Sequence, residues 1–177
     1  MPRYIALLRG INVGGKSMMK MDELKAVFVE LGFENVKTYI NSGNVAYDSG
    51  RSSEKGIVKD LEEAIEKRFG RPVDVMVRKQ STIREIVEGN PLAGEFESHK
   101  QMHVLFLKNE LPLEKQFQLS EADFGNEIVI CLGREIYVLL PAGVAESVFS
   151  KKAVLDKTPR VPYTGRNWRT VQKLAEL

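Results

Sequence analysis

The order in which strand-like and helix-like segments alternate in the first 80 residues is the feature that most constrains the fold. Apolar residues recur at helical spacing over 21–31 and 57–69, and each stretch ends at a glycine, Gly32 or Gly70, which suits a helix C-terminus. β-Branched and aromatic runs surround these stretches, and the expected strands are 4–8, 36–40, 45–47 and 73–77. The turn residues Asn-Ser-Gly-Asn at 41–44 join the middle two strands into a hairpin. The resulting order, β-α-β-β-α-β, is that of a ferredoxin-like unit.

The second half of the chain repeats much of this order, although the two halves share no close residue-level repeat. Its expected strands are 103–107, 127–132 and 136–140, and its expected short helices are 113–119 and 144–149. Gly133-Arg134, between the last two strands, is a pair that suits a tight type II′ turn. A basic, proline-containing segment and a helix over 167–176 follow.

We therefore expect an α+β protein of two ferredoxin-like halves, with antiparallel or mixed sheets and a C-terminal helix. The expected boundaries are 1–80 for the N-terminal half, 81–101 for a connector with a short helix over 81–87, and 102–177 for the C-terminal half.

Composition and charge indicate the expected cellular location and the partners that are not expected. The only cysteine, Cys131, has no partner for an intramolecular disulfide, and no apolar run reaches membrane-spanning length, so we expect a soluble, cytoplasmic protein. The formal net charge of +2 indicates no general affinity for nucleic acid or membranes. Residues 150–173 differ, because seven basic residues against one acid give this segment a charge of +6.

Residues 10–17, Gly-Ile-Asn-Val-Gly-Gly-Lys-Ser, match the Walker A pattern of phosphate-binding loops. Three features argue against a P-loop NTPase: two short hairpins where parallel strands would be needed, no convincing second acidic motif, and too few residues for five crossover units. Two readings stay open. The glycines simply permit a tight loop with positive φ, or exposed amides with Lys16 and Lys20 form an anion pocket without hydrolysis.

Three segments together resemble a bacterial family known as domain of unknown function 1697 (DUF1697). They are 6–16, Ala-Leu-Leu-Arg-Gly-Ile-Asn-Val-Gly-Gly-Lys; 38–45, Thr-Tyr-Ile-Asn-Ser-Gly-Asn-Val; and 164–168, Thr-Gly-Arg-Asn-Trp, with Thr170, Val171, Lys173 and Leu174. The resemblance implies a cytosolic bacterial protein with an α+β fold related to ferredoxin-like units, and it carries no catalytic or binding residues over. It also implies a loop over 10–20, with a helix that begins near Met21.

The sequence gives little support for metal or nucleophile chemistry. The two histidines, His99 and His103, and the single cysteine do not form a zinc-binding spacing, so we expect no metal site and no cofactor. His103 is expected to be a strand residue with a satisfied hydrogen bond. Cys131 lies in an apolar run, which predicts a buried, inert thiol. No catalytic residue can be assigned.

The candidate ligand-binding residues are polar side chains and glycines in expected loops or at the ends of elements: Arg9, Asn12, Gly14, Gly15, Lys16, Asn41, Ser42, Asn44, Arg166, Asn167 and Arg169. In one reading these residues serve turns and helix caps, with Asn167 as an N-cap. In the other they converge into one polar groove. Trp168 is expected in the core, and Arg166, Arg169 and Lys173 are expected on an exposed face that could follow a phosphate backbone.

Our leading functional hypothesis from the sequence is a binding module for a phosphate-bearing ligand, either a nucleotide or a nucleic acid. The alternatives are an enzyme acting on a small anionic metabolite oriented by Arg9, Lys16 and Arg166, and a protein-interaction module.

The anion-pocket hypothesis predicts the effect of removing one cation. Lys16→Ala should weaken binding of a phosphate-bearing ligand by about 1–3 kcal/mol, because one charged hydrogen bond is lost. Isothermal titration of nucleotides and oligonucleotides would measure this change. ATP turnover that is abolished by both Lys16→Ala and Ser17→Ala would instead establish the NTPase.

Overall fold

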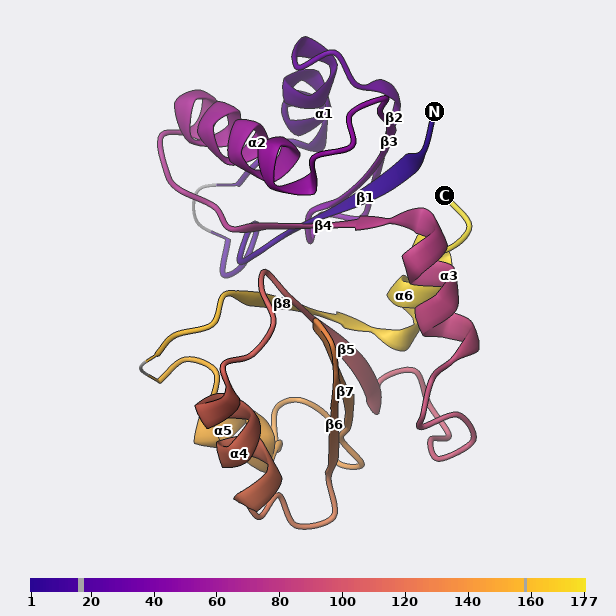
Figure 1. The fold of residues 1–177 in the computed structure, drawn as a ribbon, viewed down its shortest axis with the longest axis vertical. Helices are drawn as coiled ribbons and strands as arrows, with labels where there is room; N and C mark the ends of the chain where they lie inside the picture. Colours follow the sequence, from indigo (N-terminus) through magenta and orange to yellow (C-terminus); the bar gives the residue numbers. More distant parts are fainter. Residues whose placement is uncertain (16–17, 158) are drawn as a thin grey trace. The chain divides into compact units, whose positions relative to one another are not determined.

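The computed structural model describes residues 1–15, 18–157 and 159–177 (Figure 1). The chain divides into two compact units. Unit 1 comprises Met1–Glu85 together with Leu174–Leu177, and unit 2 comprises Ile86–Lys173. Each unit contains one four-stranded sheet, so the expected α+β class is confirmed.

Unit 1 has the β-α-β-β-α-β order that the sequence predicts. Its elements are β1 (Arg3–Leu8), α1 (Met21–Glu30), β2 (Glu34–Tyr39), β3 (Asn44–Asp48), α2 (Glu54–Phe69) and β4 (Val75–Lys79), followed by the first part of α3 (Gln80–Glu88). The strands lie in the order β2-β3-β1-β4, and every neighbouring pair is antiparallel. The edge strand β2 has an irregularity in register between Glu34 and Lys37.

Alternate residues of β1 place one apolar face of this sheet against α1 and α2. Tyr4, Ala6 and Leu8 belong to the resulting buried cluster, which includes Phe28 from α1 and Leu61 from α2. The helix boundaries follow local chemistry, because the Ser53 side chain accepts a hydrogen bond from the Gly56 amide at α2's start. At the other end, Gly70 caps α2 with a φ of 74°.

Unit 2 has the same topology with different lengths. Its elements are β5 (Met102–Leu107), α4 (Leu113–Glu121), β6 (Ile128–Leu132), β7 (Glu135–Leu139), α5 (Val148–Lys152) and β8 (Tyr163–Asn167), with α6 (Trp168–Leu174) after them. The strand order β6-β7-β5-β8 repeats that of unit 1, and all pairs are antiparallel. The hairpin at Gly133-Arg134 is confirmed, with Gly133 at a φ of 61°.

Two expectations for unit 2 are corrected. The sequence did not predict β8, which pairs with β5 and completes the second β-α-β-β-α-β set. The helix expected over 144–149 begins later, at Val148, because its N-terminus is fixed by the Ser147 side chain and by the distant Glu127 carboxylate.

Trp168 at the start of α6 is buried, as expected for a core residue, and its ring meets Phe96 edge-on with 6.0 Å between centroids. Trp168→Ala should therefore lower the free energy of unfolding by about 3–5 kcal/mol, through lost burial and a residual cavity. The matched control is the neighbouring Arg169, which is exposed, so Arg169→Ala should change stability by no more than about 0.5 kcal/mol. Urea unfolding of both variants measures the difference, and equal stabilities would contradict the core assignment.

Candidate ligand pocket

In unit 1, Asn12 ties the Gly-rich loop to the β2–β3 hairpin. Its Nδ2 donates to the carbonyl oxygens of Met19 at 3.0 Å and Asn41 at 2.8 Å, and its Oδ1 accepts from the Met19 amide at 2.6 Å. Asn12 itself has a positive φ of 55°. Its polar atoms are therefore engaged in holding the loop, which favours the structural reading over the ligand-binding one.

The remaining glycines of the loop are exposed. Gly14 and Gly15 have φ values of 72° and 70°, and no atom lies within 4 Å of where a Cβ would be. Lys16, like Ser17, lies outside the described residues. The helix begins at Met21, as the family resemblance implied, and its first turn carries two acids, Asp22 and Glu23. Negative charge at this helix N-terminus opposes anion binding there.

The hairpin residues also serve the turn. Asn44 is fully buried, and its Nδ2 donates to the Tyr39 carbonyl oxygen and to Ser42 Oγ, both at 3.0 Å. Gly43 has a φ of 87°, and a Cβ there would lie 2.8 Å from the Ile11 side chain. The structure thus brings Asn12, Asn41, Ser42 and Asn44 together, but as a hydrogen-bonded turn.

In unit 2, the basic C-terminal residues separate into different roles. Asn167 is the expected N-cap, since its Oδ1 accepts from the Thr170 amide at 3.0 Å. Arg169 is exposed. The expectation of an exposed Arg166 is wrong: its side chain is 6% exposed and donates to Thr164 Oγ1 at 2.7 Å and the Gly165 carbonyl at 2.8 Å. Burial lowers the pKa of Arg166 to about 10.

Arg166 is buried because it lies in β8, a strand that the sequence did not predict. Arg166 pairs with Val104 of β5, so the two side chains lie on the same face of the sheet. Gly165 and Asn167 lie on the opposite face, beside Leu105 and His103. The basic stripe expected on one helix is therefore divided between a buried strand residue and the exposed surface of α6.

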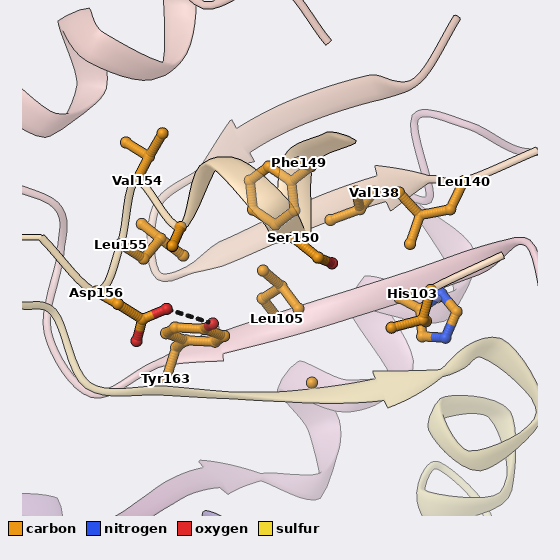
Figure 2. Close-up of a pocket in the computed structure, with 13 residues that line it drawn as sticks. His103, Leu105, Val138, Leu140, Phe149, Ser150, Val154, Leu155, Asp156 and Tyr163 are labelled. Atoms are coloured by element: carbon orange, nitrogen blue, oxygen red, sulfur yellow. Dashed lines mark hydrogen bonds between the residues drawn. The ribbon is translucent and has the colours of Figure 1, made fainter. Parts of the chain in front are cut away.

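That opposite face of the unit 2 sheet lines a cavity of about 300 Å³ (Figure 2). The sheet contributes His103 and Leu105 from β5, Val138 from β7, and Tyr163 and Gly165 from β8. The covering wall comes from α5 and the segment after it, and its lining residues include Phe149, Ser150, Val154, Leu155 and Asp156. The lining is mainly apolar, with a few polar groups.

His103 is the polar group at one end of this cavity. Its Nδ1 is buried and has no hydrogen-bond partner within the described chain, so the expectation of a satisfied hydrogen bond is wrong. Its place in a strand is confirmed, between Val138 and Asn167. Burial lowers the pKa of His103, and the charge of His99 lowers it further, so the imidazole is neutral at pH 7.

The other end of the cavity holds a hydrogen-bonded pair, and Figure 2 shows it opposite His103. Tyr163 donates its hydroxyl to Asp156 Oδ2 at 3.2 Å. Between the two ends, the Ser150 side chain points toward the strands. Gly165 leaves the floor of the cavity without a side chain, and a Cβ there would lie 3.0 Å from Leu105 Cδ2. Any larger residue at 165 would occupy the cavity.

Two long-range polar contacts hold the covering wall in place. The Glu127 carboxylate, just before β6, accepts from the backbone amides of Val148 and Phe149, both at 2.8 Å. Lys115 of α4 is fully buried, and its Nζ donates to the carbonyl oxygens of Val154 at 2.6 Å and Lys157 at 2.8 Å. These contacts lie at the two ends of the covering wall, so specific hydrogen bonds hold the wall over the cavity.

The sequence did not predict this cavity, because His103 was expected to be a strand residue with a satisfied hydrogen bond. The available signal was an unusual combination: a histidine within an apolar strand, and a glycine inside what is a strand. Cys131, in β6, is half-buried, and burial raises the pKa of its thiol, which makes it a poor nucleophile at neutral pH. Over residues 1–15, 18–157 and 159–177, no cluster of three or more metal-ligating side chains occurs. In the same residues no helix is long and apolar enough to cross a membrane.

Comparisons with known proteins found one family and a similar solved structure. The family described as protein of unknown function (DUF1697) matches residues 1–137. A solved structure, described as that of the conserved bacterial protein SP0830 from Streptococcus pneumoniae, is similar with a TM-score of 0.83. The two chains are 24% identical, and the similarity covers 99% of this chain and 97% of the other, which supports the fold alone. No curated protein matches the sequence.

The lowered pKa of His103 predicts how stability depends on pH. The unfolded chain binds a proton near pH 6.5, the ordinary value, whereas the folded chain binds it only at lower pH. The contribution of His103 to the free energy of unfolding is therefore fully present above pH 6.5, and it is lost as the pH decreases toward the folded-state pKa. His103→Gln should remove this part of the pH dependence, while His99→Gln should retain most of it, because burial is the larger cause of the lowered pKa of His103. Thermal unfolding between pH 5 and 8 measures the effect, and identical profiles for wild type and His103→Gln would contradict it.

Proposed function

Because the chain belongs to the family of proteins of unknown function DUF1697, whose description assigns no activity, we propose its function from the geometry of unit 2. The protein is a binding module for a small, mainly apolar molecule that carries a hydroxyl group. The molecule occupies the cavity between the sheet and the α5 wall, and its hydroxyl contacts His103. Two observations carry this proposal: His103 lines an apolar cavity, and the buried Nδ1 of the same residue has no hydrogen-bond partner within the described chain.

The energetic reason is the cost of an unmade hydrogen bond. A buried polar atom without a partner costs about 1–3 kcal/mol, which a correctly placed ligand group recovers. A neutral imidazole presents either an acceptor or an N–H donor at Nδ1, depending on its tautomer. A hydroxyl group can both donate and accept, so it satisfies either tautomer.

Size and polarity define the rest of the ligand. A volume of about 300 Å³ lies at the lower end of the range for small-molecule sites, so it suits a ligand of one or two rings. Apolar side chains such as Leu105, Val138 and Phe149 line the walls and favour an apolar body. A phenol or another aromatic alcohol combines these properties.

The same cavity is unsuited to a phosphate group. None of the described residues that line it is a lysine or arginine, and one of them, Asp156, is acidic. Transfer of a phosphate into such surroundings would leave its charge uncompensated. The phosphate-binding hypothesis therefore stays a prediction for the Gly-rich loop of unit 1. The hypothesis of an enzyme for anionic metabolites also stays a prediction, although Arg166, one of its expected cations, is buried on the other face of β8.

The test compares matched probes and matched variants. Phenol and benzyl alcohol should raise the melting temperature of the wild type and bind in isothermal titration, whereas toluene, which lacks the hydroxyl, should bind more weakly. His103→Phe retains an aromatic ring without the nitrogen, and it should reduce the advantage of phenol over toluene by about 1–3 kcal/mol.

A second variant tests the location. Gly165→Val places a side chain on the cavity floor, so it should abolish binding of both probes, while Arg169→Ala, on the exposed face of α6, should leave binding unchanged. Near-ultraviolet circular dichroism would establish that Gly165→Val is folded. Phenol binding that survives in Gly165→Val, or no binding of any apolar probe to the wild type, would refute the proposal.

A further inference from the structure

The outer edge of β6 is an unprotected sheet edge. In the strand order β6-β7-β5-β8, β6 pairs only with β7 among the strands of the described chain. Its sequence, Ile-Val-Ile-Cys-Leu over 128–132, contains no charged residue and no proline, and its register against β7 runs without a bulge. Such an edge presents unpaired backbone groups to any other strand.

The edge strand of unit 1 shows the contrast. β2 carries Glu34 and Lys37 and has an irregular register between them, and both features discourage pairing with another chain. The absence of these protections in β6 therefore distinguishes it from an ordinary edge strand of the same protein.

The hairpin determines which backbone groups β6 presents. In a hairpin with the two-residue turn Gly133-Arg134, the closing pair Leu132–Glu135 is hydrogen-bonded, and hydrogen-bonded pairs recur at every second residue. Ile130 and Ile128 thus direct their amides toward β7. Val129 and Cys131 direct their amide and carbonyl groups outward, to the free edge.

The surface beside this edge is also apolar. On the outer face of α4, Leu113 is 82% exposed and Phe117 is 65% exposed. These two residues are one helical turn apart, and the next side chains around the helix, Gln116 and Ser120, line a cavity of about 230 Å³ together with Cys131 and other residues. An exposed aromatic side chain therefore lies next to an open groove on the same side of β6.

We propose that β6 is a dimerisation edge, which pairs antiparallel with β6 of a second copy of this chain. With Ile130 on the two-fold axis, Val129 of each copy faces Cys131 of the other. These outward groups then form two hydrogen-bonded pairs, about four hydrogen bonds in total. Ile128 faces Leu132 of the other copy, and these two residues are 38% and 51% exposed in the single chain.

A second copy fits this edge better than an unrelated strand for two reasons. The five residues are apolar throughout, so an antiparallel self-pairing brings no like charges together. The two-fold axis also brings both copies of α4 to the same side of the joined sheet, where Phe117 of each copy can cover the groove of the other. A closed, isologous contact follows.

The test measures the association of the full chain. Sedimentation equilibrium over a concentration series should show a monomer–dimer equilibrium for the wild type. Val129→Pro removes an amide that points away from β7 and so takes no part in the β6–β7 ladder, and it should raise the dimer dissociation constant at least about tenfold. Val129→Ala retains the amide and is the matched control, for which the dimer should persist.

Two further measurements keep the outcome interpretable if Val129→Pro folds poorly. Leu132→Lys adds a charge at a half-exposed edge position, and it should weaken the dimer by a similar factor. In the proposed register the two Cys131 side chains are diagonal neighbours with Cβ atoms about 7–8 Å apart, so a short bismaleimide should cross-link the wild type. A wild type that stays monomeric up to its solubility limit would overturn the proposal, as would a dimer unaffected by both Val129→Pro and Leu132→Lys.

Discussion

The buried ammonium group of Lys115 is the contact on which the architecture of unit 2 depends most. It joins α4 to the carbonyl oxygens of Val154 and Lys157, more than thirty residues away in sequence, through a long side chain whose Nζ has enough donors for both. Removal of this amine would leave two partly buried carbonyl groups without their donor. Lys115 therefore helps to hold the segment after α5 over the sheet, together with the apolar packing of Leu155, and the cavity lies beneath this segment.

The two units share a topology but treat the covered face of the sheet differently. In unit 1, the central strand places Tyr4 on that face, and its hydroxyl donates to the Arg51 carbonyl at 3.0 Å. The corresponding position in unit 2, judged from strand order and register, is His103, whose Nδ1 has no partner within the described chain. Ala6 of β1 pairs with Val77, whereas Leu105 of β5 pairs with Gly165.

The helices that follow the two hairpins, α2 and α5, also differ between the units. α2 has 16 residues and covers its sheet with a continuous apolar stripe, whereas α5 has 5 residues and continues as an irregular segment. Unit 1 thus fills the space between helix and sheet with side chains, and unit 2 leaves part of it open. Both units therefore have an apolar core between sheet and helices, and in unit 2 a cavity adjoins that core.

Local sequence patterns predicted most of the helices and strands but little of the cavity. Strands such as β5 and helices such as α2 follow from apolar periodicity and turn residues, which act between near neighbours. β8 was missed because Gly165 and the prolines before it lower its strand propensity, and only pairing with β5 stabilises it. The burial of Arg166 depends on that long-range pairing, and the missing partner of His103 depends on which side chains the fold of unit 2 places around it, so local patterns predict neither.

The covering wall of the cavity has a kinetic consequence. Glu127 holds the start of α5 through two backbone amides, Lys115 holds the segment that follows, and the Tyr163 hydroxyl donates to Asp156 within that segment. In the binding function proposed above, opening of these attachments would contribute to the rate at which a ligand leaves the partly open cavity.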